Sequence, residues 1–140
     1  MKTYIKIALG VVLILAVAGI GTGLYLFNLK PRNLSKARPD FTITAADIQK
    51  AFEDNESAAT AKYVGKVVEV TGEISAVKPG ENNSVSISMR TSNEMSSVIC
   101  TFPASNKPAG LNPGQTGVIN GVCSGFLMDV LLNNCAIAVK

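Results

Sequence analysis

The feature that most constrains this chain is an uninterrupted apolar run near its start. Residues 7–27 carry no charge and read IALGVVLILAVAGIGTGLYLF. At about 1.5 Å per residue, a helix of this length covers the roughly 30 Å hydrocarbon core of a bilayer. The run therefore predicts a transmembrane helix at 7–27, preceded by a short N-terminal tail, residues 1–6.

A cleaved signal peptide is the alternative interpretation of the same segment. MKTYIK would form its positively charged start, and AVA at positions 16–18 a small-residue cleavage site. Apolar residues continue well past Ala18, however, and the run ends in Tyr25 and Phe27, aromatic residues of the kind enriched at membrane interfaces. We therefore expect an uncleaved anchor that contacts membrane lipid through residues 7–27.

The positive charge of the chain is concentrated around this segment. The whole chain has a net charge of +3, but residues 1–40 hold six Lys and Arg against one Asp, a net +5. Residues 41–140 hold seven basic against nine acidic residues, a net −2. The basic residues thus belong to the membrane flank, where they can meet anionic headgroups, and the rest of the chain is mildly acidic.

The charges on the two sides of the span are nearly balanced, so the positive-inside rule does not decide the orientation. Two Lys precede the run, and Lys30, Arg32, Lys36 and Arg38 follow it. The long span and the short N-terminal tail predict a single-pass protein of the inner (cytoplasmic) membrane, with its C-terminal domain in the periplasm.

Two different patterns follow the span. Residues 28–42 contain two prolines, four cations and no apolar periodicity, which predicts an extended juxtamembrane linker before a domain at 43–140. Thr44 with Asp47 three residues on is typical of a helix start, and apolar residues at helical spacing predict one amphipathic helix, 45–60, that buries Ile48 and Phe52. We interpret its acidic face as a solvated surface rather than a metal site.

From Lys66 onward the apolar period changes to two. The segment KVVEVTGEISAV places Val68, Val70, Ile74 and Ala76 on one face, and Gly72 lies where a bent strand or a close approach needs no side chain. Further strands are predicted in SVSISMR, SSVICTF, GVINGVC and FLMDVLLNNCAIAV. This order predicts a mainly β domain, a five-stranded Greek-key barrel of the OB (oligonucleotide/oligosaccharide-binding) type with one N-terminal amphipathic helix. A fragment of a five-stranded sandwich is the alternative.

Several of these segments together resemble one family. LYLFNLKPRN, the run from ITAADIQKAF to GEISAV, VICTF and above all GVCSGFLMDVLLNNC are similar to the tRNA_anti-like family, membrane-anchored OB-fold proteins common in Bacteroidota. The resemblance extends over nearly the whole chain and implies the OB fold. The family name refers to anticodon-binding OB domains, so it suggests nucleic-acid binding only through the fold, and it implies no catalytic residue.

Three cysteines are the next candidates for chemistry. The chain has Cys100, Cys123 and Cys135 but no histidine, so an ordinary zinc site lacks ligands and a nucleophilic thiol lacks a base. Each cysteine falls on an apolar strand face, which leaves two interpretations open, core thiols or a disulfide. In the OB strand order the third strand lies beside the fifth and parallel to it, so Cys100 and Cys135 are the expected pair in an oxidising compartment. Cys123, just before the turn of the last hairpin, would stay free.

Asp129 is the one charge in an apolar strand. A ligand anchor at the barrel rim is one interpretation, but we expect a carboxylate that binds backbone amides beside the SGF turn.

No phosphate loop, metal set or nucleophile with its base is visible, so we expect neither an enzyme nor a cofactor. The sequence predicts a non-catalytic, membrane-tethered OB-fold binding module for an envelope protein or a glycan. The alternative is a module for single-stranded nucleic acid, which needs a basic face with exposed aromatic residues. Since the domain is net −2 and two of its aromatics, Phe52 and Phe102, lie on core faces, nucleic acid is not the expected partner.

Overall fold

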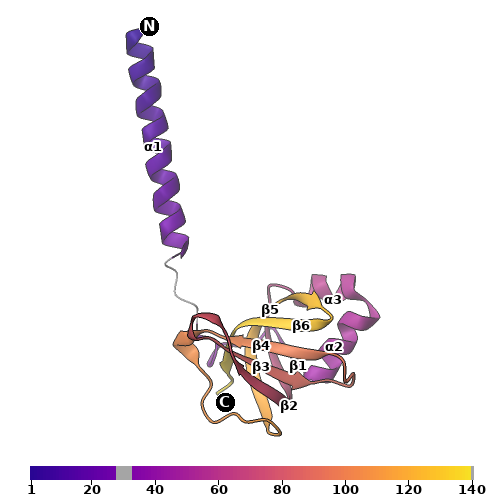
Figure 1. Ribbon diagram of the computed structural model, residues 1–140. Helices are drawn as coiled ribbons and strands as arrows, with labels where there is room; N and C mark the ends of the chain where they lie inside the picture. The colour runs from indigo at the N-terminus through magenta and orange to yellow at the C-terminus, as the bar shows by residue number, and fades with distance from the viewer. Residues whose placement is uncertain (28–32, 140) are drawn as a thin grey trace. The chain divides into compact units, whose positions relative to one another are not determined.

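The computed structural model describes residues 1–27 and 33–139, which fall into two compact units, Met1–Lys30 and Pro31–Lys140. The first unit is a single helix, α1 (Lys2–Phe27), and its part Lys2–Leu26 is long and apolar enough to cross a membrane (Figure 1). The helix begins at Lys2 rather than after a six-residue tail, because MKTYIK contains no glycine or proline that would interrupt it.

The second unit is mainly β, with two helices near its start. Its elements are β1 (Phe41–Thr44), α2 (Ala45–Asp54), α3 (Glu56–Tyr63), β2 (Val67–Pro79), β3 (Val85–Arg90), β4 (Ser97–Phe102), β5 (Thr116–Leu127) and β6 (Asp129–Ile137). Two single 3₁₀ turns, Glu81–Asn83 and Ala104–Asn106, lie in the loops.

Five strands close into a barrel. The sheet order is β1-β2-β3-β4-β6-β5, and an additional pairing of β2 with β5 closes the ring from β2 to β6. Neighbours in the ring are antiparallel except β4 and β6, which are parallel. This is the predicted OB-type Greek-key barrel, and the prediction is confirmed. Figure 1 shows α2 and α3 together at one end of it.

The barrel core follows the two-residue alternation of the strands. Val68, Val70, Ile74, Ile87, Met89, Val98, Cys100 and Phe102 are all fully buried. Ala76 was expected to share this face but is only half-buried, because the pairing of β2 with β3 shifts register between Ile74 and Ala76. Gly72 allows β2 and the start of α2 to lie close together, since a Cβ at residue 72 would lie 2.8 Å from the Cβ of Ala45.

The predicted single helix 45–60 is wrong, because the chain forms two helices with a break at Asn55. Thr44 caps α2 by accepting a hydrogen bond from the Asp47 N–H, and the Asn55 side chain caps α3 by accepting one from the Ala58 N–H. Asparagine is among the best N-cap residues, which explains why the chain restarts there. Ile48 and Phe52 are buried as predicted.

Part of the expected linker packs onto the barrel. Residues 28–32 of the 28–42 segment lie outside the described residues, but Leu34 is 2% exposed and its carbonyl accepts a hydrogen bond from Asn120 Nδ2. Asp40 exchanges hydrogen bonds with the backbone of Val67, and β1 then pairs with β2 in parallel. The folded unit therefore begins before residue 43, and β1 is a sixth strand outside the ring.

The final hairpin turns later than expected. The SGF segment lies inside β5, where the pairing with β6 shifts register between Cys123 and Gly125 and Gly125 has a positive φ of 153°. The turn itself is at Met128, between Leu127 and Asp129. Gly125, which the sequence pattern suggested as a turn residue, is instead part of this β-bulge.

Candidate binding groove

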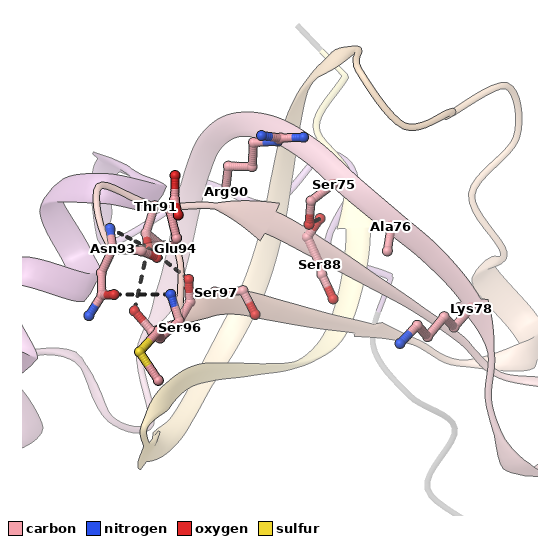
Figure 2. A pocket seen from close by; sticks show the side chains of 11 residues that line it. Ser75, Ala76, Lys78, Ser88, Arg90, Thr91, Asn93, Glu94, Ser96 and Ser97 are labelled. Carbon is pink, nitrogen blue, oxygen red and sulfur yellow. Dashed lines mark hydrogen bonds between the residues drawn. The ribbon is translucent and has the colours of Figure 1, made fainter.

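A polar groove of about 460 Å³ lies on the outer surface of the barrel. Strand β2 contributes Ser75, Ala76 and Lys78, strand β3 contributes Ser88 and Arg90, and the rest comes from the β3–β4 loop up to the start of β4, residues 91 and 93–97. Figure 2 shows Lys78 at one end and the loop residues Thr91, Asn93 and Ser96 at the other, with Arg90, Ser75, Ser88 and Ala76 between them.

Strand alternation makes the floor of the groove polar. In SVSISMR, Ile87 and Met89 point into the core, so the serine between them, Ser88, faces outward. The bulge after Ile74 brings Ser75 beside it, and the Ser75 hydroxyl donates to the Ser88 carbonyl at 3.1 Å. The floor therefore presents the Ser88 hydroxyl, which can donate and accept hydrogen bonds, and the Ser75 hydroxyl, which can still accept them.

Two cations flank these hydroxyls. Arg90 Nε lies 3.3 Å from Glu73 Oε1, and both side chains are largely exposed, so the pair leaves the remaining guanidinium donors open to solvent. Lys78 lies within salt-bridge distance of no carboxylate in the described part of the chain. The groove can thus bind an anionic substituent beside Lys78 or Arg90 and uncharged polar groups between these two cations.

The β3–β4 loop, which forms one wall of the groove, is held in place by hydrogen bonds among its own residues. Thr91 Oγ1 lies 2.9 Å from the Asn93 carbonyl oxygen and 2.8 Å from that of Ser96, and the Met95 N–H donates to Asn93 Oδ1 at 3.0 Å (Figure 2). Such side-chain bonds to the local backbone fix a turn without regular secondary structure.

A carboxylate on α2 ties this loop to the helix. Glu53 Oε1 accepts hydrogen bonds from Gln49 Nε2 at 3.1 Å, Asn93 Nδ2 at 3.2 Å and Ser96 Oγ at 3.5 Å. The bonds from Gln49 and Asn93 are the main causes that lower the pKa of Glu53, since they favour the charged carboxylate. The loop is therefore held by an ionised group.

Asp129 holds the start of β4 at the rim of the groove. Its Oδ1 accepts hydrogen bonds from the backbone N–H of Ser97 at 2.7 Å and from the Ser97 hydroxyl at 3.1 Å. The expected role, a carboxylate bound to a backbone amide, is confirmed. Its place differs, since Asp129 follows the Met128 turn and opens β6 rather than standing beside an SGF turn.

The three cysteines are free thiols in the core, each fully buried. Cys100 lies opposite Leu132 across the parallel β4–β6 pairing, and the Cys100 thiol contacts that of Cys135. Burial and the neighbouring Cys100 thiol raise the pKa of Cys135 well above its ordinary value, and burial raises that of Cys123. The thiols of Cys123 and Cys135 are therefore protonated at neutral pH and are poor nucleophiles.

The structure therefore brings Cys100 and Cys135 together, and their disulfide stays a prediction. None of the three cysteines lines the groove. Within residues 1–27 and 33–139, no group of three or more Cys, Asp or Glu side chains is placed to hold a metal ion.

Sequence reasoning did not single out the groove residues. The outward serines of SVSISMR were a signal for a polar face, but the groove also needs the β2 bulge and the folded loop, which depend on tertiary structure.

The tRNA_anti-like family model matches residues 1–137, which is nearly the entire chain. The chain belongs to the tRNA_anti-like family. No curated protein sequence matches it. One similar crystal structure is a lipoprotein of Klebsiella pneumoniae subsp. pneumoniae for which nucleic-acid binding has been suggested, with a TM-score of 0.59 and 22% identity over 70% of this chain and 91% of that one.

That likeness shows the fold of this tRNA_anti-like protein. OB barrels commonly bind their ligands on the face of the second and third barrel strands, with the loops between the first and second and between the fourth and fifth strands. Counted along the ring, those strands are β3 and β4, and the groove uses β2, β3, the β3–β4 loop and the first residue of β4. The groove thus overlaps that face at β3 and at the start of β4, and extends from it over β2.

Proposed function

We propose that this protein is a non-catalytic, membrane-tethered binding module whose groove takes a glycan of the cell envelope. The observation that supports it is the groove itself, a hydroxyl-rich groove of about 460 Å³ on the outer surface of an OB barrel that contains Lys78 and Arg90. A glycan presents a row of hydroxyl and amide groups, which the Ser88 hydroxyl can meet as donor or acceptor and the Ser75 hydroxyl as acceptor. The two cations suit acidic substituents such as carboxylates.

The lining of the groove favours a glycan over single-stranded nucleic acid. Proteins that bind single strands combine a cationic track with aromatic side chains on which the bases stack. None of the residues that line the groove is aromatic, and the two cations there are accompanied by Glu94. Residues 41–140 carry a net −2, which works against a polyanion.

We place the domain at the inner membrane, on its periplasmic side. Helix α1 has the length and composition of a span, and the similar Klebsiella structure is a lipoprotein, which fits attachment to the envelope. A C-terminal alkaline phosphatase fusion is expected to be active and a C-terminal GFP fusion dark. The reverse result would place the domain in the cytosol.

The groove is tested by titrating full-length protein in nanodiscs with soluble muropeptides, fragments of the envelope glycan peptidoglycan, using calorimetry. Lys78→Ala, Arg90→Ala and Ser88→Val should each weaken binding about three- to tenfold, since each removes one hydrogen-bonding or charged group from the site. Lys66→Ala is the matched control, because Lys66 is an exposed cation outside the groove. Equal loss in the control would contradict a site in the groove.

Single-stranded nucleic acid is the second candidate, favoured by one observation, the binding suggested for the similar Klebsiella lipoprotein. It requires the domain on the cytosolic side or access to extracellular nucleic acid. Micromolar binding of an oligo(dT) that weakens steeply with added salt would support it over the glycan.

A further inference from the structure

Exposed apolar side chains gather at one end of the groove. Met95 is 84% exposed, Leu127 77% and Met128 70%, three of the largest exposures among the apolar side chains in the described part of the folded unit. Met95 lies in the β3–β4 loop, and the other two form the tip of the β5–β6 hairpin. A second pocket of about 240 Å³ lies between the two loops, lined by Glu53, Asn93, Met95, Ser96, Phe126 and Met128. We call it the methionine pocket.

The hairpin tip is held in an unfavourable conformation that keeps Met128 outward. Met128 has φ +67°, a left-handed backbone that glycine or asparagine adopts much more readily. Gln49, which is fully buried, donates a 2.9 Å hydrogen bond from Nε2 to the Met128 carbonyl. A large apolar residue kept at a strained, solvent-exposed turn points to a role in binding rather than in folding.

The floor and the other wall of the pocket are also firmly placed. Phe126 stacks on Phe52 of the core, with ring centroids 5.4 Å apart and planes 16° from parallel. Met95 belongs to the loop that Thr91 and Asn93 brace and that Glu53 ties to α2. A pre-formed pocket loses little conformational entropy when a ligand enters, while the flexible methionine side chains can adapt to its shape.

The charge at the pocket selects among possible occupants. Glu53 is the one titratable residue that lines the methionine pocket, and Glu94, the neighbour of Met95, lines the adjoining groove. The hydrogen bonds to Glu53 from Gln49, Asn93 and Ser96 all go to Oε1, so the carboxylate keeps its negative charge at the edge of the pocket. Anionic lipid headgroups would be repelled there, and a second copy docked on the same face would oppose two negative rims.

We propose that the methionine pocket docks a partner protein through an apolar side chain of a segment that carries Lys or Arg next to that side chain. The apolar side chain enters between Met95 and Met128 and rests on Phe126, and the basic residue pairs with Glu53. The site is distinct from the glycan groove, although the loop residues Asn93, Met95 and Ser96 line both. It does not depend on the identity of the groove ligand.

Methyl NMR tests the proposal on the full chain in zwitterionic nanodiscs. The chain has four methionines, of which Met95 and Met128 line the pocket while Met89 is fully buried in the barrel and serves as internal reference. The probe is a synthetic 12-residue amphipathic peptide of leucine and lysine, and the control is the same peptide with glutamate in place of lysine. Saturable shifts at Met95 and Met128, without a shift at Met89, are expected for the lysine peptide.

Three variants separate the parts of the proposal. Met128→Asn keeps a residue that tolerates the positive φ and should abolish the shift at Met95, whereas Val77→Asn alters an exposed apolar residue outside the pocket and should not. Glu53→Gln retains an acceptor for the loop hydrogen bonds and should weaken the lysine peptide about two- to fivefold, the range of one exposed ion pair.

Each other outcome would overturn the proposal. Equal binding of the glutamate peptide would refute the role of Glu53, and no saturable shift with either peptide would refute a docking site. Met95 and Met128 shifts that depend on lipid composition without peptide would assign the pocket to the bilayer. Shifts that depend on protein concentration alone would assign it to a second copy.

Discussion

Replacing Asp129 separates its structural role from the ligand-anchor role that the sequence left open. In Asp129→Ala the Ser97 N–H loses a charge-assisted hydrogen bond of 2.7 Å, and the Ser97 hydroxyl loses one of 3.1 Å. Hydrogen bonds to charged groups contribute about 1.5–3 kcal/mol each, and the half-buried position allows water to replace part of this. We expect a loss of about 2 kcal/mol in the free energy of unfolding, which corresponds to roughly 10 °C in Tm for a domain of this size.

Two further variants divide this loss between the bonds. Ser97→Ala removes the hydroxyl and leaves the backbone bond, so it should cost about 0.5–1 kcal/mol. Asp129→Asn keeps a neutral acceptor and should fall between Ser97→Ala and Asp129→Ala. Thermal unfolding followed by circular dichroism in the strand region, on the full chain in nanodiscs, measures all three. An Asp129→Ala protein within about 0.5 kcal/mol of wild type would refute the structural role.

Three other predictions rest on single contacts. Gly72→Ala should destabilise the fold by about 1–3 kcal/mol, because the new Cβ would lie 2.8 Å from the Cβ of Ala45. Adding Ala45→Gly should recover most of this loss in thermal melts, whereas purely additive losses would contradict the clash. Because the pKa of Glu53 is lowered, its contribution to loop stability is fully present above the ordinary value of 4.5 and is lost as the pH falls through the lowered pKa. Amide hydrogen exchange in residues 91–96 should therefore become faster only in that acidic range. Exchange with no acid-dependent step would contradict this role of Glu53. Cys100 and Cys135 should be bridged when a thiol–disulfide oxidase acts on the domain, as peptide mapping without reductant would show, and a bridge that includes Cys123 would contradict the strand neighbours seen here.

The barrel could be predicted because its strands alternate. In SVSISMR and SSVICTF every second side chain is apolar, and this pattern places Ile87, Met89, Cys100 and Phe102 in the core without knowledge of the tertiary structure. The parallel neighbours β4 and β6 then follow from the OB strand order, which is why Cys100 and Cys135 could be expected to lie close together.

Features that depend on one residue or on distant contacts could not be predicted in this way. Asn55 divides the helix through its capping side chain, although the apolar spacing continues across it. Leu34 is one apolar residue among polar ones, and its carbonyl accepts a hydrogen bond from Asn120, far along the chain. The Met128 turn was missed because the glycine at 125, the residue that usually marks a turn, is used in a bulge instead.

The candidate groove could not be predicted from the sequence, because it too depends on contacts between distant residues. Ser88 could be assigned to an outward face, but its proximity to Ser75 requires the register shift in β2, and the loop wall requires the Glu53 bonds from α2. None of these contacts joins residues close enough in sequence to leave a local pattern.

A direct competition between the two ligand classes tests the central claim, that the groove of this tRNA_anti-like protein takes a glycan. The full chain in nanodiscs is titrated at low salt with fluorescent oligo(dT) by anisotropy and with muropeptides by calorimetry, using the wild type, Arg90→Ala and the Lys66→Ala control. The account predicts muropeptide binding that Arg90→Ala weakens and Lys66→Ala does not, with no oligonucleotide binding in the micromolar range. Micromolar oligo(dT) affinity that falls steeply with salt, together with no muropeptide binding, would contradict it.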